Sequence, residues 1–239
     1  MMPKLSERLE MASAIVTGYQ AIPVLFENDD LIAVDKPDKL ASIPERNREN
    51  VSLLKILSET LDRKLYTVHR LDKQVSGVIL FAKTPEAHRR LNLMFEHRQV
   101  HKTYMALVHG EIAGERGVID KPLRRFGSGR MGVAVDQGKP CVTEFTVEER
   151  LTGYTRVKVS PLTGRKHQIR AHFFGIGHPI VGDTLYGDKS LQKTFPRLML
   201  HALSIRLLLA PVGQDVAVTS EIPISFSEVL RSIRHPTSR

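Results

Sequence analysis

The sequence predicts an α+β protein, in which antiparallel-type strand patterns come in runs with a few helices between them. A hairpin pattern at residues 24–35 opens the arrangement, and an unbroken apolar run follows at Gly77–Ala82. Two further segments, Lys139–Arg150 and Tyr154–Ser160, alternate apolar and polar side chains as half-buried strands do. A chain of 239 residues is long enough for one domain or for two closely apposed lobes.

The first half of the chain contains a hairpin and two helices. Val24–Glu27 and Leu31–Asp35 flank a polar turn, and Lys36-Pro37 ends the second strand because proline cannot continue strand pairing. Apolar residues three and four apart predict a helix over Ser52–Leu61. Another helix begins after Thr84-Pro85, where threonine caps the helix and proline fits its first turn.

The second half is richer in strands. Thr103–His109 and Leu198–Ala210 are predicted strands, and the stretch between them that is rich in Gly and Arg, Leu123–Gly138, is predicted to be a long exposed loop. A short helix is expected over Thr163–Phe174, ended by the glycines that follow it. Ser227–Ile233 is the last predicted helix.

Charge and composition restrict the classes of partner. Lys and Arg total 35 against 26 Asp and Glu, which gives a formal net charge of +9 and favours a polyanionic partner. The single cysteine, Cys141, excludes an internal disulfide framework and a cysteine-rich zinc site, and fits a reducing compartment. No apolar run reaches the roughly 18 residues of a membrane span. We therefore expect a cytoplasmic protein without membrane association.

The segment Tyr66–Gly77 contains a candidate catalytic carboxylate. Asp72 lies just before the apolar run, and the flanking cations Arg70 and Lys73 would hold it ionised. An ionised and partly desolvated carboxylate can act as a nucleophile or as a general base. The alternative is an ordinary surface turn in which Asp72 pairs with Arg70 or Lys73, and this segment alone favours that alternative.

Two further segments contain candidate site residues. Tyr104 interrupts an apolar strand, either as a core tyrosine with a bonded hydroxyl or as a ring that stacks on a base. In a helix over residues 163–174, Arg170 would lie one turn beyond Lys166 and His167. A guanidinium grips a carboxylate with two parallel bonds, so Arg170 could orient Asp72 across a cleft. The alternative is a basic helix that contacts phosphates or solvent.

Two patterns are interpreted as carrying no function. Residues 127–132 read G-x-G-x-x-G but lack the strand–turn–helix context of a dinucleotide site. His167 and His172 have a spacing compatible with metal ligation, yet no acidic or cysteine ligand accompanies them. No metal site is therefore predicted.

Taken together, the ordered motifs resemble those of the RluA-like pseudouridine synthases. The matching segments are His69-Arg70-Leu71-Asp72 with Ser76-Gly77, Lys102-x-Tyr104-x-Ala106, Thr163-Gly164-Arg165-x-His167-Gln168-Ile169-Arg170, Gly177–Asp183 with Tyr186-Gly187, and Leu200-His201-Ala202. The resemblance covers residues 24–226, and it departs at Val75, where the family usually has threonine.

The resemblance implies an enzyme that isomerises uridine in RNA to pseudouridine without metal, nucleotide or redox cofactor. It implies a mixed, mostly antiparallel sheet with flanking helices and a central cleft. Asp72 would be the catalytic carboxylate, either attacking the sugar or removing a ribose proton. Tyr104 would stack on the target ring and take part in proton transfer, and Arg170 would pair with Asp72. Arg70 would take the place of the flipped base in the RNA stack.

The expected partner is a stem-loop of ribosomal or transfer RNA, bound by a monomer without a protein partner. Residues 1–22 are predicted to be a loosely attached leader with a helical turn near Leu5–Met11. Residues 23–239 would form the catalytic domain, without a separate S4 domain. Phosphate contacts would come from a set of cations, namely Arg124, Arg125, Arg130, Arg165, Lys166 and His167.

Other functional classes fit less well. A non-catalytic RNA-binding or ribosome assembly protein with a synthase fold is the alternative, and it would be indicated by loss of Asp72, Tyr104 or Arg170, all of which are present. A nuclease needs acidic metal ligands, and a glycosidase needs a second carboxylate. Asp72 is the only carboxylate of the sequence whose neighbours suggest a catalytic role, so both of these classes are less favoured.

Overall fold

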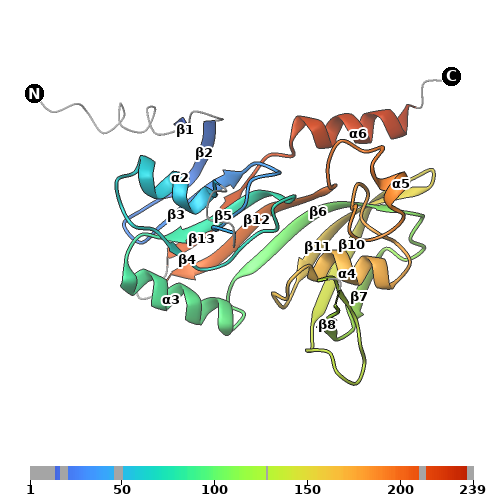
Figure 1. The fold of residues 1–239 in the computed structure, drawn as a ribbon, viewed down its shortest axis with the longest axis horizontal. Helices are drawn as coiled ribbons and strands as arrows, with labels where there is room; N and C mark the ends of the chain where they lie inside the picture. The colour runs from blue at the N-terminus through green and yellow to red at the C-terminus, as the bar shows by residue number, and fades with distance from the viewer. Residues whose placement is uncertain (1–13, 17–20, 46–50, 128, 210–213, 236–239) are drawn as a thin grey trace, which may run out of the picture. The chain divides into compact units, whose positions relative to one another are not determined.

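The fold of this protein is shown by a computed structural model (Figure 1), which describes residues 14–16, 21–45, 51–127, 129–209 and 214–235. The chain divides into two compact units. Unit 1 comprises the described residues up to Val100 together with Ser204–Ser220, and unit 2 comprises His101–Leu203 and the described residues from Glu221 onward. Strand β12 (Leu200–Leu209) begins in unit 2 and continues into unit 1.

Unit 1 is built on antiparallel strands. Its strand order is β1-β2-β3-β5-β12-β13, and β4 pairs with β5. The elements are β1 (Ala14–Val16), β2 (Ala21–Glu27), β3 (Leu31–Lys36), α2 (Leu53–Thr60), β4 (Tyr66–Thr67), β5 (Ser76–Ala82), α3 (Pro85–Glu96), part of β12, and β13 (Gln214–Thr219). Every residue of β5 is buried, as expected of a strand covered on both faces. Helices α2 and α3 flank these strands (Figure 1).

The predicted hairpin and both predicted helices of unit 1 are confirmed. The side chain of Asn28 makes the turn between β2 and β3 by accepting hydrogen bonds from the backbone N–H groups of Asp30 and Leu31. Ser52 caps α2, and Thr84 caps α3 by accepting a hydrogen bond from the N–H of Ala87. These caps satisfy N–H groups that a helix start leaves without a partner.

The start of the chain differs from the prediction of a loose leader. The predicted helical turn around Leu5–Met11 lies outside the described residues. Residues Ala14–Val16 form β1, which pairs antiparallel with β2, and Ile22 is 1% exposed. The first strand of the hairpin therefore begins at Ala21, before the predicted start at Val24 and within the segment assigned to the leader.

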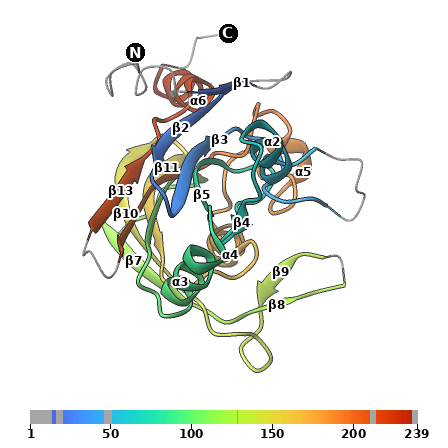
Figure 2. The same ribbon diagram turned by 90° about the vertical axis from the view of Figure 1, so that its left-hand side faces the viewer.

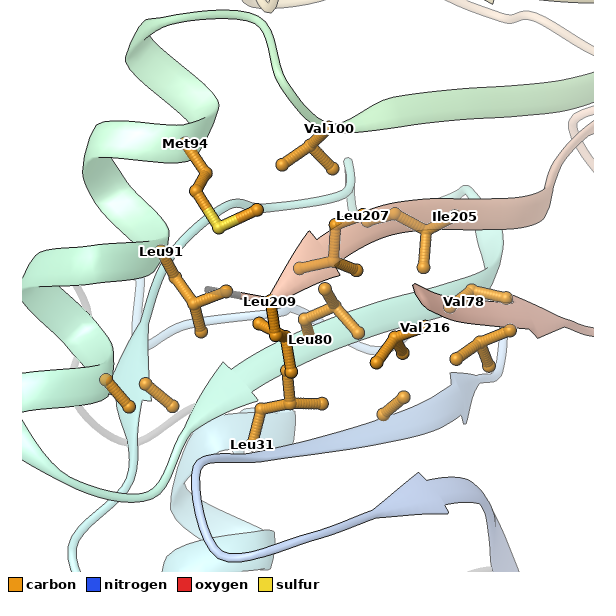
Figure 3. Packing of buried hydrophobic residues seen from close by; sticks show 14 residues of the cluster. Leu31, Val78, Leu80, Leu91, Met94, Val100, Ile205, Leu207, Leu209 and Val216 are labelled. Carbon is orange, nitrogen blue, oxygen red and sulfur yellow. The ribbon is translucent and has the colours of Figure 1, made fainter. Parts of the chain in front are cut away.

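The core of unit 1 joins residues from distant parts of the sequence (Figure 3). Leu31 and Leu80 on neighbouring strands pack in one cluster with Leu91 of α3 and with Leu207 and Val216 of β12 and β13. The spacing of Ala87, Leu91 and Met94 predicts which face of α3 is buried, and the structure confirms it. Strand β13 is an element that the sequence pattern did not predict.

Unit 2 contains an antiparallel sheet with the strand order β6-β11-β10-β7. Its elements are β6 (His101–His109), β7 (Arg116–Asp120), β8 (Leu123–Arg125), β9 (Met131–Val133), β10 (Val142–Leu151), β11 (Tyr154–Pro161), α4 (Gln168–Gly175), α5 (Lys189–Gln192) and α6 (Ile224–Arg234). The predicted alternation in β10 and β11 is confirmed, because Thr143, Phe145, Thr155 and Val157 are all buried.

The prediction of a long exposed loop at Leu123–Gly138 is wrong. Strands β8 and β9 pair antiparallel as a hairpin that extends away from the four-stranded sheet of unit 2 (Figure 2). Leu123 is 1% exposed and anchors the base of the hairpin. Near its tip the Phe126 ring packs over Gly132, where an added Cβ would lie 2.8 Å from the ring. Each of these strands has only three residues, too few to show an alternating pattern in the sequence.

The overall architecture agrees with the predicted α+β class of mostly antiparallel strands with few helices. No helix in the described part of the chain is long and apolar enough to cross a membrane.

Candidate active site

The loop that carries Asp72 in unit 1 is held by buried contacts. Asp72 is half-buried, and its backbone carbonyl accepts a hydrogen bond of 3.0 Å from the N–H of Val75. One residue earlier, Ser42 and Leu71 bond reciprocally, with the serine hydroxyl donating to the Leu71 carbonyl at 2.8 Å and accepting from its N–H at 3.1 Å. Both residues are buried, so the backbone before Asp72 is fixed.

A fully buried lysine holds the other side of this loop. Lys36, at the end of β3, donates from its ammonium to the carbonyl oxygens of Pro37 and Leu40, each at 2.8 Å, and to that of Lys73 at 3.3 Å. A buried ammonium is tolerated because these carbonyl oxygens replace the water it loses. Lys36 therefore joins the end of β3 to the residue after Asp72.

His69 fixes the entry into the loop. Its Nε2 atom accepts a hydrogen bond of 3.0 Å from the N–H of Leu80, and its ring stacks on Phe95 with 4.9 Å between ring centroids. This bond requires an unprotonated Nε2. His69 connects the loop to β5 and α3, which is a positioning role within unit 1.

The cations that flank Asp72 are exposed. Arg70 and Lys73 line a small pocket together with Leu71 and residues 41–45. Lys73 lies 3.4 Å from Glu45 in an exposed ion pair, a kind of pair that contributes little to stability. The exposure of Arg70 places its guanidinium where a ligand can reach it.

Tyr104 and Arg170 belong to unit 2. Tyr104 is half-buried in β6, opposite Val159 of β11. Two residues earlier, burial lowers the pKa of Lys102 below its usual value. Tyr104 directly precedes the buried stretch Met105–Val108 of β6, and its role as a stacking partner stays a prediction.

Arg170 is buried in α4 and grips Asp183 with two bonds. Its Nε atom lies 2.7 Å from Oδ2 of Asp183 and its Nη2 atom 2.8 Å from Oδ1. Asp183 is itself held, because Oδ1 also accepts the N–H groups of Leu185 and Tyr186. This bidentate geometry fixes the plane of the guanidinium. The pairing of Arg170 with Asp72 stays a prediction.

The predicted helix over residues 163–174 begins later than expected. Helix α4 starts at Gln168, and His167 before it has a left-handed backbone with φ of 52°. The Gln168 side chain holds the preceding loop, since its Oε1 accepts from the Thr163 hydroxyl at 2.7 Å and from the N–H of Arg165 at 3.0 Å. The prediction that Lys166 and His167 share a helical face with Arg170 is therefore wrong.

The predicted phosphate-binding cations of unit 2 differ in exposure. Arg165 and Lys166 are exposed on the loop before α4, and Arg125 and Arg130 are exposed on the β8–β9 hairpin. Arg124 is only half-exposed and packs over the Phe126 ring, 4.6 Å from its centroid. Arg124 therefore supports the hairpin through its side chain, as well as contributing charge.

Cys141 and His172 form a buried polar pair in unit 2. The Cys141 sulfur lies 3.1 Å from Nε2 of His172, and the Thr143 hydroxyl lies 2.9 Å from Nδ1. Burial raises the pKa of Cys141 to about 11 and lowers the pKa of His172. A thiol with that pKa is a poor nucleophile. Among the described residues, no group of three or more His, Cys, Asp or Glu side chains could hold a metal ion.

Comparison with known proteins identifies the family. The family model described as RNA pseudouridylate synthase matches residues 30–174. A dual-specificity RNA pseudouridine synthase RluA from Yersinia pestis is 40% identical over 182 residues, covering 75% of this chain and 88% of the relative. The ribosomal large subunit pseudouridine synthase D from Nitrosomonas europaea is 37% identical over 231 residues, covering 90% of this chain and 67% of the relative.

Solved structures agree with these relatives. The human protein called RNA pseudouridylate synthase domain containing 1 superposes with a TM-score of 0.73 at 27% identity, covering 90% of this chain and 95% of the other. The chain therefore belongs to the RNA pseudouridine synthases, isomerases that convert uridine to pseudouridine in RNA. Within that family it is an RluA-like member.

Several residues that organise these loops had no predicted role. Lys36, Gln168, Asp183 and Tyr186 all lie in segments whose residue pattern was noted, yet their side-chain contacts were not predicted. A polar residue inside a run that is otherwise buried, as Lys36 is at the end of β3, is the sequence signal that could have identified them.

Proposed function

We propose that this protein isomerises specific uridines in structured ribosomal or transfer RNA, with Asp72 as the catalytic carboxylate. The observation that carries the proposal is the rigid loop around Asp72, held by Ser42 on one side and by Lys36 on the other. Such rigidity suits a group that must meet one atom of a substrate. Relatives named for the ribosomal large subunit support a ribosomal substrate.

In the proposed mechanism the target uridine leaves its stack, which costs a few kcal/mol. Arg70, exposed beside Asp72, takes its place in the RNA, and Tyr104 stacks on the extruded ring. Asp72 then either attacks ribose C1′ or removes a ribose proton, and in both routes the bond from C1′ to ring nitrogen N1 breaks. The rotated uracil bonds to C1′ through C5, which displaces the Asp72 carboxylate in the first route and takes back the ribose proton from Asp72 in the second. C5 finally loses its proton and N1 gains one. Arg170 pairs with Asp72 and orients it, as the resemblance implies. No net oxidation occurs, because the product is an isomer of the substrate.

Phosphate contacts offset the cost of extrusion. The proposed contacts come from Arg125 and Arg130 on the hairpin and from Arg165, Lys166 and His167 before α4, with Arg124 supporting the hairpin. The formal net charge of +9 is consistent with this type of binding. We further propose that the protein acts as a monomer in the cytoplasm.

Replacing Asp72 with asparagine tests the chemistry. The variant should bind RNA like the wild type in a filter-binding assay and should form no pseudouridine. Asp62→Asn is the matched control, because Asp62 is exposed in the same unit and has a φ of 45° that asparagine tolerates. Turnover by Asp72→Asn would overturn the assignment. Pseudouridine mapping of total RNA from cells with and without the protein identifies the modified uridine.

Replacing Arg125 and Arg130 with alanine tests the RNA contacts. The slope of log affinity against log salt should become shallower by about 0.7–0.9 for each phosphate that the variant no longer binds. Arg206→Ala with Arg234→Ala removes the same charge from arginines that already pair with carboxylates, and it should change the slope less. Equal slopes for wild type and the hairpin variant would reject binding by the hairpin.

A further inference from the structure

Tyr186 lies where three parts of unit 2 meet. It is 1% exposed and follows the turn that carries Asp183. Its neighbours come from the β8–β9 hairpin, from the loop before α4 and from α4 itself. A tyrosine with a buried ring and a bonded hydroxyl has two separate means of holding its surroundings.

The phenol oxygen connects the hairpin to the loop before α4. It accepts a hydrogen bond of 2.8 Å from the backbone N–H of Met131, the first residue of β9. It also lies 3.1 Å from Nδ1 of His167, in a hydrogen bond whose direction depends on the histidine tautomer. The residue before Met131 is Arg130, so this bond fixes the backbone next to a proposed phosphate contact.

The aromatic ring holds the arginine of α4. The guanidinium carbon of Arg170 lies 5.2 Å from the Tyr186 ring centroid, and the Phe174 ring packs against Tyr186 at 5.9 Å between centroids. Asp183 grips the edge of the same guanidinium and also accepts the N–H of Tyr186. The Arg170 guanidinium is therefore held at its edge by the Asp183 carboxylate and on its face by the Tyr186 ring.

Packing between the hairpin and α4 supports the same connection. Leu123 of β8, Ala171 of α4 and Tyr186 form one buried cluster, and Val133 of β9 packs against it. A Cβ added at Gly175 would lie 3.0 Å from Val133, so the helix and β9 approach closely. The hairpin therefore packs against α4 through apolar contacts, in addition to its hydrogen bond to the Tyr186 hydroxyl.

We propose that Tyr186 is a positioning residue with two separable functions, its hydroxyl fixing the β8–β9 hairpin for RNA binding and its ring fixing Arg170 for catalysis. This inference rests on the proposed function of the hairpin and of Arg170. RNA affinity and turnover then depend on different atoms of one side chain, which a purely structural role would not produce.

Tyr186→Phe removes the oxygen and keeps the ring. With a stem-loop transcript that spans the mapped uridine, we expect the KM to rise about fivefold, because the hairpin loses the hydrogen bond that fixes Met131, while kcat stays within about twofold. Hydrogen–deuterium exchange of the Met131 amide should become faster in the free protein. Tyr154→Phe removes the same atom from a tyrosine in β11 and should change neither quantity. An unchanged KM or unchanged exchange at Met131 would overturn the hydroxyl's role.

Tyr186→Leu removes the ring as well. We expect kcat to fall by a further factor of about ten, because Arg170 loses the face it packs against. A kcat equal to that of Tyr186→Phe would overturn the ring's role. The hairpin variant lacking Arg125 and Arg130 separates the two levels of the proposal. If that variant binds RNA as tightly as the wild type, the proposed function of the hairpin is wrong. If it binds RNA weakly while Tyr186→Phe binds RNA as tightly as the wild type, the inference on Tyr186 is wrong.

Discussion

Replacing Lys36 with methionine would measure how strongly one buried ammonium holds the Asp72 loop. Methionine keeps an unbranched side chain but removes the N–H donors. The carbonyl oxygens of Pro37, Leu40 and Lys73 would lose a donor that now lies 2.8, 2.8 and 3.3 Å away. All three belong to the loops that surround Asp72.

The magnitude follows from these distances. A buried acceptor left without a donor costs about 1–3 kcal/mol, and the two short bonds carry most of the effect because the bond to Lys73 is longer than usual. Relief from burying a charge offsets part of the loss. We therefore expect the free energy of unfolding of unit 1 to fall by about 2–4 kcal/mol.

Urea unfolding followed by circular dichroism would measure this change. With a dependence of about 2 kcal/mol per molar urea, the midpoint should fall by about 1–2 M. Lys55→Met is the control, because the Lys55 side chain is 57% exposed and lies 3.8 Å from Glu59, so its loss should cost at most about 0.5 kcal/mol. Pseudouridine formation in a single turnover should also slow. A midpoint within about 0.2 M of the wild type, with an unchanged slope, would show that Lys36 does not hold the loop.

Three further predictions concern unit 2. The pKa of Cys141 is raised from 9.0 to about 11, so the stability that its burial confers is fully present below pH 9 and declines as the pH rises toward 11. Iodoacetamide should therefore label Cys141 at pH 8 only after the protein unfolds. Because the pKa of His172 is lowered from 6.5, unit 2 should lose stability as the pH falls below that value, and a flat pH profile of the melting temperature would contradict this. Gly182→Ala should prevent correct folding, since an added Cβ would overlap the Arg197 carbonyl. Gly153 has the same φ of 76° but open space around it, so Gly153→Ala should lower the free energy of unfolding by only about 1–2 kcal/mol, as measured by thermal unfolding.

The sequence predicts much of the fold where the signal is local. The cap at Thr84, the alternation from Thr143 to Val147 and the apolar run of β5 each need only neighbouring residues, and the structure confirms all three. The hairpin at residues 123–133 escapes such a pattern because its strands have only three residues each. Its stability comes from burial of Leu123 against residues elsewhere in the chain.

The site was predictable only in part. Ordered motifs identify Asp72, Tyr104 and Arg170 as candidates, but a motif does not show what holds each side chain in place. The bond from Tyr186 to Met131 spans 55 residues and that from Lys36 to Lys73 spans 37, so no local pattern reveals them. The predicted start of α4 is too early because His167 has a left-handed backbone that separates the loop from the helix, and the preference of histidine for this conformation is too weak to predict it.

The interleaved path of the chain has a consequence for biosynthesis. The apolar cluster that contains Leu31 and Leu80 is completed by Ile205, Leu207 and Val216, which follow the whole of His101–Leu203 in the sequence. On a ribosome that adds about 5–20 residues per second, the first hundred residues would wait on the order of ten seconds for those strands to emerge. During that interval the apolar side chains that these strands will cover, among them Leu31 and Leu80, stay exposed to solvent. Exposed apolar surface of this kind is what chaperones bind.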